Sequence, residues 1–351
     1  MKISPTLPTI AHPYQLDTFT ITELTADTPI TIRLGTTTIL QATLTPDPSG
    51  TITFTDMGRY ISERATELAI DTFDALPLTI TAATTQLANI TLFPCRDRLT
   101  ATCQDIIAAN FLTPAVAGPK LIPLDAQQEL LTWYVHQPDD IRLEAIAQWV
   151  DYTTHQRCEQ RQYIHPSRGT DHVKQADVAP HLLEPPTIPG TWHLITYQVT
   201  LGPRLITYTI APDGYPSTTP TCLTFRNIFG HLDTFYLYGT RTTQIKPTYT
   251  SALVNGHTIN YQIDSNPTYQ VHTGHMPQGT YALFRDLITS PHIYDSDGTP
   301  ITITEVEVKP TNDPTDTLTA TITYRQAPES GINTALQSIS TFDKTFDQTF
   351  N

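Results

Sequence analysis

The sequence has little of the chemistry on which disulfide-linked folds and metal sites depend. Only four cysteines occur among 351 residues, at positions 95, 103, 158 and 222, and no two of them form a C-x-x-C pair. This scarcity and spacing argue against a disulfide framework and against a structural zinc module. We expect the four cysteines to be buried free thiols.

Long apolar runs and positive charge are also scarce. No run approaches the roughly 18 apolar residues needed to cross a bilayer, and residues 1–10 lack the apolar core of a signal peptide. Lys and Arg number 20 against 34 Asp and Glu, which gives a net charge of −14 at pH 7. Nucleic acid is therefore a poor partner for this surface. The sequence predicts a soluble, unprocessed chain without membrane insertion.

Threonine is what the sequence has in abundance, with 64 residues, and 29 prolines accompany it. β-Branched residues favour strands, and prolines favour turns and strand ends. Hydrophobic residues make up 39% of the chain, enough for two or three cores. The composition predicts an all-β protein with two or three β-sandwich domains, Ig-like or jelly-roll-like, and little helix.

Alternating runs separated by turn residues divide the chain into four parts. Residues 1–96 are expected to form an N-terminal β-sandwich, and residues 97–188 a middle β-rich domain that ends in a polar linker. Residues 189–330 are expected to form a larger C-terminal β-sandwich. Residues 331–351 form an aromatic tail that we interpret as a docking segment.

Four segments are harder to interpret from their pattern. In residues 56–72 the apolar residues fit helical spacing as well as strand spacing, so a short helix is an open alternative there. The pattern of residues 125–135 favours a strand over a helix. The pattern of residues 141–150 favours a strand and a helix almost equally. Residues 153–189 are polar and show no periodicity, so we expect a long loop or linker that contains the end of the middle domain.

No catalytic or cofactor-binding motif stands out. The sequence has no G-x-S-x-G elbow and no H-E-x-x-H pair. A group of imidazoles and a thiol within residues 155–172 has zinc-like chemistry, but its spacing matches no zinc module and nearby arginines would repel a cation; these residues are His155, Cys158, His165 and His172. A solvated polar loop is the preferred interpretation. We expect no enzyme activity, no metal and no cofactor.

Residues 295–298, Asp-Ser-Asp-Gly, resemble the start of a calcium loop. The pattern lacks the Gly at position six and the Glu at position twelve, and the next residues enter a strand. We therefore predict a hairpin turn.

The three tryptophans, Trp133, Trp149 and Trp192, lie in patterned apolar stretches and are expected in cores.

The most distinctive stretch is residues 225–238, which is dense in aromatics on both sides of a glycine. It predicts a strand, a corner with local turn bonding, and a second strand. The simpler interpretation is a sandwich core with a tight corner. Because aromatic side chains are also enriched in interface cores, the alternative adds a subunit contact. The candidate interface residues are Phe225, Asn227, Phe229, Gly230, Phe235 and Tyr236.

The chain closes on a short repeat with Phe at every fourth position, namely Phe342, Phe346 and Phe350. This spacing places the three rings on one face of a helix or along one extended arm. A frayed polar terminus or a last strand packed on its own domain is the alternative. The docking hypothesis is that these rings gain their burial on a partner.

The stretch Phe-Arg-Asn-Ile-Phe-Gly-x-x-Asp-x-Phe-Tyr, the later Phe-Arg-Asp-Leu-Ile-x-Ser at residues 284–290, and the closing Thr-Phe-Asp-x-Thr-Phe-Asn carry a resemblance. The chain resembles virion or tail-associated β-rich proteins of tailed phages and prophages of gut Bacteroidetes. The resemblance covers about the last 160 residues and implies a structural or tail-assembly role without catalytic residues. It implies location in a phage tail or, during assembly, in the host cytoplasm.

The expected function is therefore that of a non-enzymatic tail protein that contacts other tail or virion proteins and forms a homo-oligomer. A surface adhesin or glycan-binding β-sandwich module is the alternative. A polysaccharide depolymerase or glycosidase is a third possibility, for which no residue can be nominated, because any acidic surface offers carboxylate pairs.

Overall fold

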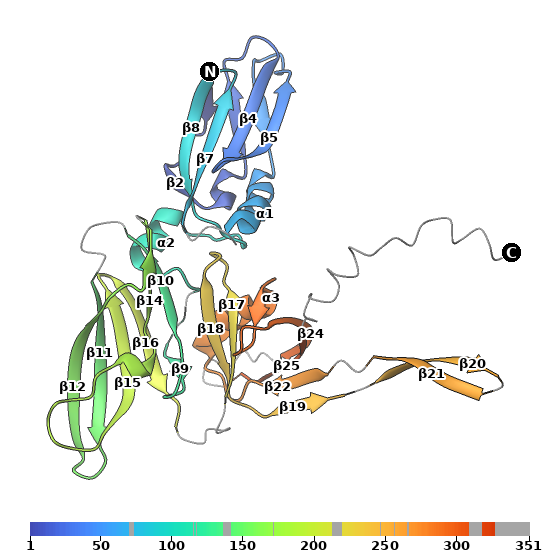
Figure 1. Cartoon of the computed structure of the whole chain (residues 1–351). Coiled ribbons are helices and arrows are strands. Elements are labelled where there is room, and N and C mark those ends of the chain that lie inside the picture. Colours follow the sequence, from blue (N-terminus) through green and yellow to red (C-terminus); the bar gives the residue numbers. More distant parts are fainter. Residues whose placement is uncertain are drawn as a thin grey trace.

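The computed structural model describes residues 1–69, 74–114, 116, 118–135, 142–170, 172–212, 220–245, 247–255, 257–264, 267–308 and 318–326. Half of the chain (50%) lies in strands and 13% in helices, so the predicted all-β fold is confirmed. Figure 1 shows three units, with the N-terminal unit standing at one end of the middle and C-terminal units. In the part of the chain that the structure describes, no helix is long and apolar enough to span a membrane.

The N-terminal unit consists of two sheets and a helix around one core. Its strands alternate apolar and polar residues, so each sheet buries one face; in β4, Ile30, Ile32 and Leu34 point inward. Helix α1 (Met57–Ala69) confirms the helix left open over residues 56–72, and its Ile61 and Ala65 complete the core. The strand orders are β1(Lys2–Ser4)-β3(Phe19–Thr22)-β6(Ile52–Phe54) and β2(Ile10–Ala11)-β8(Thr85–Leu92)-β7(Leu76–Ala82)-β4(Thr28–Leu34)-β5(Thr37–Leu44), with the short helix η1 at Pro13–Leu16.

The middle unit packs a five-stranded sheet against a three-stranded one. The large side chains between them include Trp133, Trp149 and Tyr197, all buried, as expected for two of the three tryptophans. Trp192 is partly buried against the same core. The strand orders are β12(Gln156–Ile164)-β11(Leu143–Asp151)-β15(Trp192–Leu201)-β16(Arg204–Ile210)-β9(Lys120–Ile122) and β10(Leu130–Tyr134)-β14(Val173–Asp177)-β13(Arg168–Gly169), with helices α2 at Cys103–Ala109 and η3 at Pro180–Leu182.

The middle unit differs from the sequence-based expectation in two ways. The prediction of a long loop over residues 153–189 is wrong, because three strands, β12, β13 and β14, lie within it. β15 pairs with β11, and β16 pairs with β15 and β9, so residues 192–210 belong to the middle sheet. The predicted boundary at 188/189 therefore separates strands that are hydrogen-bonded to each other.

The C-terminal unit contains one seven-stranded sheet with helix α3 (Tyr281–Thr289) on it. Its two edge strands, β18 and β19, follow each other in the chain. Just after β18, Tyr238 N–H donates to the carbonyl of Thr273 (3.0 Å), which follows β22 near the opposite edge. The sheet therefore curls back on itself. Phe225 and Phe284 fill the space between sheet and helix. The strand order is β18(Leu232–Leu237)-β17(Thr221–Arg226)-β23(Ile293–Tyr294)-β24(Pro300–Val308)-β25(Ala320–Gln326)-β22(Thr268–His272)-β19(Arg241–Gln244), with helix η4 at Gln278–Thr280.

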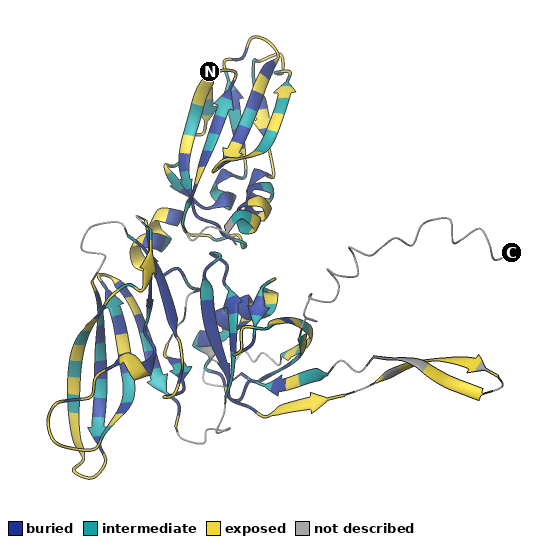
Figure 2. Cartoon of the chain, viewed as in Figure 1, coloured by how far each residue is buried: buried dark blue, intermediate teal, exposed yellow. Residues whose placement is uncertain are grey.

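A two-stranded ribbon, β20 (Thr248–Val254) and β21 (His257–Asp264), extends from the C-terminal unit away from the rest of the molecule (Figure 1). Where Figure 2 colours the ribbon by burial, it is exposed. Elsewhere in this unit, the hairpin turn predicted at residues 295–298 is confirmed. Asp295 accepts hydrogen bonds there from the backbone N–H groups of Asp297 (3.1 Å) and Thr299 (2.9 Å).

Candidate functional site

Residues 225–238 form the predicted strand, corner and strand, and they lie where all three units meet. β17 ends at Arg226 and β18 begins at Leu232, with a tight turn between them. Gly230 N–H donates to the Asn227 carbonyl (2.9 Å), and Gly230 has a φ of 80°, a left-handed conformation that favours glycine. The corner therefore depends on this glycine.

Asn227 uses its whole side chain to hold the corner. Its Oδ1 accepts from the N–H groups of Phe229 (2.9 Å) and His231 (3.1 Å). Its Nδ2 donates to the Leu112 carbonyl (2.8 Å) and to Asp233 Oδ2 (2.8 Å). Because Leu112 belongs to the middle unit, this one buried amide fixes the turn and also ties it to the neighbouring unit.

β18 makes the contact with the middle unit. Asp233 also accepts from Thr113 Oγ1 (2.7 Å), and Tyr236 Oη donates to the Gln128 carbonyl (2.8 Å). Tyr236 and Tyr238 extend into the hydrophobic core of the middle unit. The aromatics of this strand therefore serve two cores, because Phe235 lies in the core of the C-terminal unit.

A buried ionic group strengthens the same contact. Lys120 Nζ of β9 lies 2.5 Å from Glu129 Oε1 and 3.3 Å from Thr234 Oγ1, and Thr234 Oγ1 donates to the second oxygen of Glu129. The Lys120 and Glu129 side chains are only 5% and 2% exposed. Buried charges are tolerated when they are paired and hydrogen-bonded, as these are.

The corner also meets the N-terminal unit. Arg96 donates from its backbone N–H to the Ile228 carbonyl (2.9 Å), and its guanidinium pairs with Asp286 of α3. Asp286 Oδ2 accepts from Ile228 N–H (2.9 Å). A fourth hydrophobic cluster, the three-way junction, draws on all three units: Phe93, Cys95, Cys103, Ile107, Leu112, Tyr134, Val173, Ile228 and Phe229.

Burial changes the protonation of three groups at this place. Removal from water raises the pKa of Asp233 to about 6 and that of Asp286 to about 7, although hydrogen bonds and the cations Lys120 and Arg96 act in the opposite direction. Burial lowers the pKa of His231 to about 3. His231 therefore stays neutral down to about pH 3, and the carboxyl groups of Asp233 and Asp286 take up a proton at a higher pH than exposed carboxyl groups do.

The structure brings all six described candidate residues together. Phe225 and Phe235 lie in the C-terminal core, Tyr236 in the middle core, Phe229 in the three-way junction, and Asn227 and Gly230 form the turn. Their contacts lie within the C-terminal unit or between units of the same chain, and all but Gly230 are buried. The other three candidates, Phe342, Phe346 and Phe350, lie outside the described residues.

Several residues of this contact were not found by sequence reasoning. Lys120, Glu129 and Arg96 are charged residues without a motif. Asp286 lies in the stretch 284–290, but its pattern assigns it no contact, and only the fold brings these residues together. Arg204 is another: its guanidinium is buried and donates to the carbonyls of Ile107 (2.7 Å) and Tyr134 (3.0 Å). For the β20–β21 ribbon the sequence does hold a hairpin signal, the Asn255-Gly256 pair between two strand-forming runs.

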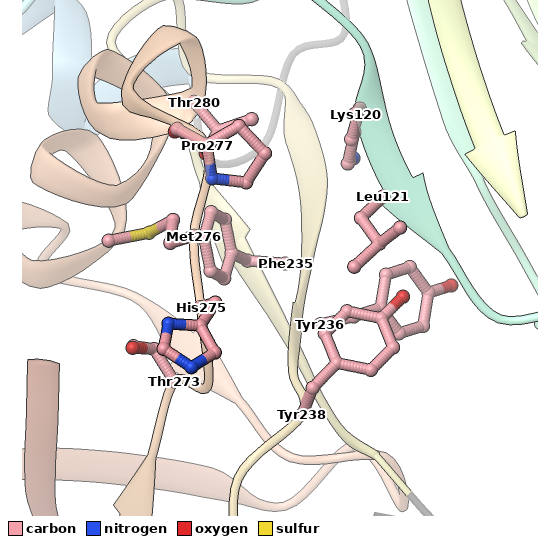
Figure 3. Close-up of a pocket in the computed structure, with 10 residues that line it drawn as sticks. All are labelled: Lys120, Leu121, Phe235, Tyr236, Tyr238, Thr273, His275, Met276, Pro277 and Thr280. Atoms are coloured by element: carbon pink, nitrogen blue, oxygen red, sulfur yellow. Dashed lines mark hydrogen bonds between the residues drawn. The ribbon is translucent and has the colours of Figure 1, made fainter. Parts of the chain in front are cut away.

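Two hollows lie between the middle and C-terminal units. The hollow in Figure 3 is bordered by Lys120 and Leu121 of β9, Phe235 and Tyr236 of β18, and residues 273–280; it measures about 20 Å³. That volume is the space of about one water molecule, so it is a packing gap and no substrate site. The second, a cleft of about 730 Å³, has the size of a ligand site.

The imidazoles and thiol of residues 155–172 do not gather into a metal centre. Cys158 is on β12, in a strand where a polar loop was expected, and His165 lies beyond its end. Over the described parts of the chain, no three side chains of His, Cys, Asp or Glu are grouped so that they could hold a metal ion. All four cysteines are free.

No model of a known protein family matches the sequence, and comparison with curated proteins gives no significant match. The function must therefore be inferred from the residues and the fold.

Proposed function

We propose that the chain is a non-enzymatic structural or assembly protein of a phage or prophage tail, which acts through contacts with other proteins. The observation that carries the proposal is the three-way junction: the stretch that resembles tail-associated proteins holds the three β units together. Its Asn227 and Tyr236 donate to carbonyls of the middle unit, and its Ile228 carbonyl accepts from Arg96 N–H of the N-terminal unit. Such a joint suits a component that must keep its parts at fixed positions inside an assembly.

The proposed partners are other tail or virion proteins and further copies of the same chain. The closing residues Phe342, Phe346 and Phe350 are proposed as a docking arm. Each Phe that becomes fully buried on a partner contributes roughly 1.5–3 kcal/mol before the cost of ordering the arm. Three rings at a regular spacing would give a multivalent attachment.

Particles from a host that carries the gene provide the test. We expect quantitative mass spectrometry of gradient-purified particles to find the chain at a fixed ratio to the major structural proteins. A variant that lacks residues 341–351 should be produced in normal amounts and be depleted from particles. Particles of normal infectivity that contain none of the chain would overturn the proposal.

A glycan-binding module is the second candidate, favoured by the cleft of about 730 Å³. Its lining combines carboxylate, amide and guanidinium groups with a tyrosine ring, which suits sugar hydroxyls and sugar faces; these include Asp125, Gln127, Gln128, Tyr236 and Arg241. A glycan array would support this candidate if binding were lost in the Gln127→Ala and Arg241→Ala variants. An array without hits would remove it.

A further inference from the structure

The β20–β21 ribbon is a hairpin with a two-residue loop, Asn255-Gly256, since Val254 and His257 are paired. Asn255 has a φ of 51°, as the favoured hairpin turns require. The strands pair from Thr248↔Asp264 to the loop, with one irregularity after Thr250. At about 3.3 Å per residue, each strand of this ribbon is on the order of 23 Å long.

The ribbon lies outside every hydrophobic core of the described structure. Large hydrophobic side chains are exposed along it and at its root: Leu253 is 74% exposed, Tyr249 55%, Ile259 49% and Ile245 64%. Eleven such side chains are exposed in the described residues, and four of them lie within these fifteen positions. The ribbon is therefore the most concentrated exposed apolar segment that the structure describes.

An isolated two-stranded hairpin is only marginally stable in water, and further strands or a covering layer stabilise it. The outer edge of each strand also presents backbone N–H and C=O groups that have no partner within the two-stranded sheet. Natural edge strands are usually protected by charged side chains or proline. Residues 248–263 contain no Lys, Arg, Asp, Glu or Pro, so within the ribbon only Asp264, at the end of β21, provides such a charge.

Charge indicates where a second copy can approach. The chain as a whole carries −14 at pH 7, so the bodies of two copies repel each other. Residues 248–263 carry no formal charge with histidine neutral, and the ribbon extends away from the body (Figure 1). Two ribbons can therefore meet without bringing the acidic bodies into contact.

We propose that the β20–β21 ribbon pairs edge to edge with the ribbon of a second copy of this chain, forming a sheet between molecules. This inference rests on the proposed function, for which it identifies one partner, a copy of the same protein. Backbone hydrogen bonds along the paired edges supply the affinity, and burial of Leu253, Tyr249 and Ile259 adds to it. A ribbon has two open edges, so closed rings are possible as well as dimers.

The test is the mass of the purified full-length chain in solution, measured by light scattering over a range of concentrations. The wild type should exceed the chain mass of 39.1 kDa by an integer factor. The variants Leu253→Lys and Leu253→Glu, each combined with the same change at Tyr249, should both return the mass to that of a monomer. Like charges on neighbouring ribbons repel whichever sign they carry.

The two signs separate this proposal from its nearest rival. If the ribbon docked on the acidic body of the second copy, the Lys variant would associate more strongly and the Glu variant more weakly. Leu205→Lys is the matched control, because Leu205 is a 56% exposed strand residue on the body, and its mass should stay that of the wild type. Circular dichroism checks that each variant is folded.

A wild type that stays a monomer at every concentration, or variants that associate like the wild type, would overturn the inference. The proposed function would survive either result if the chain is still found in purified particles. Conversely, a ribbon-dependent oligomer absent from particles would support this inference and contradict the tail assignment.

Discussion

Asn227 shows how one side chain can decide the shape of this protein. Its amide makes four hydrogen bonds while 3% exposed, two within the turn and two beyond it. Sequence reasoning found the residue and its turn role from local pattern alone. It could not find the bond to Leu112, because that residue is 115 positions away in sequence.

The first prediction concerns this amide. Asn227→Ala should lower the free energy of unfolding by about 3 kcal/mol, because buried donors and acceptors lose their partners. Urea denaturation followed by circular dichroism measures the change. Asn89→Ala, at an exposed strand position, is the control and should change stability by less than about 0.5 kcal/mol.

The second prediction concerns pH and His231. Its pKa is lowered to about 3 by burial, so the unfolded chain binds a proton below about pH 6.5 that the folded chain does not bind until near pH 3. The stability from the neutral imidazole is therefore complete above pH 6.5 and is lost as the pH falls. The His231→Gln variant has no imidazole at this position, so its stability lacks this pH-dependent contribution.

Relative to the wild type, His231→Gln should gain roughly 2–3 kcal/mol between pH 7.5 and pH 4.5 in denaturation experiments. Comparing the two proteins at each pH removes the opposite contributions of Asp233 and Asp286, whose raised pKa values favour the folded state at low pH. His165→Gln, an exposed substitution, serves as control. A difference that does not change with pH would contradict the burial of a neutral imidazole.

At the scale of elements, the strands that the sequence predicted are those with apolar residues at every second position. β4 and β11 are such strands. The pattern of residues 141–150 favours a strand and a helix almost equally, and β11 shows that a strand forms there. β10 (Leu130–Tyr134) likewise confirms the strand favoured within residues 125–135. β12 was not predicted, because two of the less exposed positions of this edge strand hold glutamine: Gln160 and Gln162 lie between Cys158 and Ile164 on the same face. Hydrophobic periodicity cannot reveal a strand whose inner positions are partly polar.

The third prediction tests the contact between β9, β10 and β18. Lys120→Met should destabilise the protein by about 3–5 kcal/mol, since it leaves the buried Glu129 carboxylate without its cation. The double variant Lys120→Met with Glu129→Gln should recover much of this loss, because no unpaired charge remains. Unfolding free energies of the wild type, the two single variants Lys120→Met and Glu129→Gln, and the double variant measure the coupling.

Arg161→Met provides the control for this pair. Arg161 and Glu159 form an ion pair, but their side chains are 61% and 45% exposed. An exposed pair contributes less than about 1 kcal/mol. If Lys120→Met were as mild as Arg161→Met, the buried pair would not stabilise the contact between the units.

At the scale of the whole molecule, composition and alternation were sufficient to predict the all-β class. They could not show that three units share a buried junction, since its members come from residues 93–112, 134, 173 and 228–229. The unit boundary was equally hidden, because β15 and β16 are ordinary alternating strands whose partners are chosen by the fold. Nor could alternation show that the ribbon lies outside the cores of the described structure.

The assembly account makes one further prediction at this scale. A chain without residues 248–264, closed by a short glycine-containing turn, should keep the stability of the wild type to within about 1 kcal/mol, because the described side chains of this segment contribute to no core. Thermal and urea unfolding measure this. A large loss of stability would mean that the ribbon is a structural part of the C-terminal unit.

The most direct test of the central proposal is gold-labelled antibody imaging of particles from a host that carries the gene, using antibodies against the purified chain. The account predicts gold on the tail of intact particles, at a constant position along it. Gold on the outer surface of host cells, with unlabelled particles, would contradict the account and favour the glycan-binding alternative.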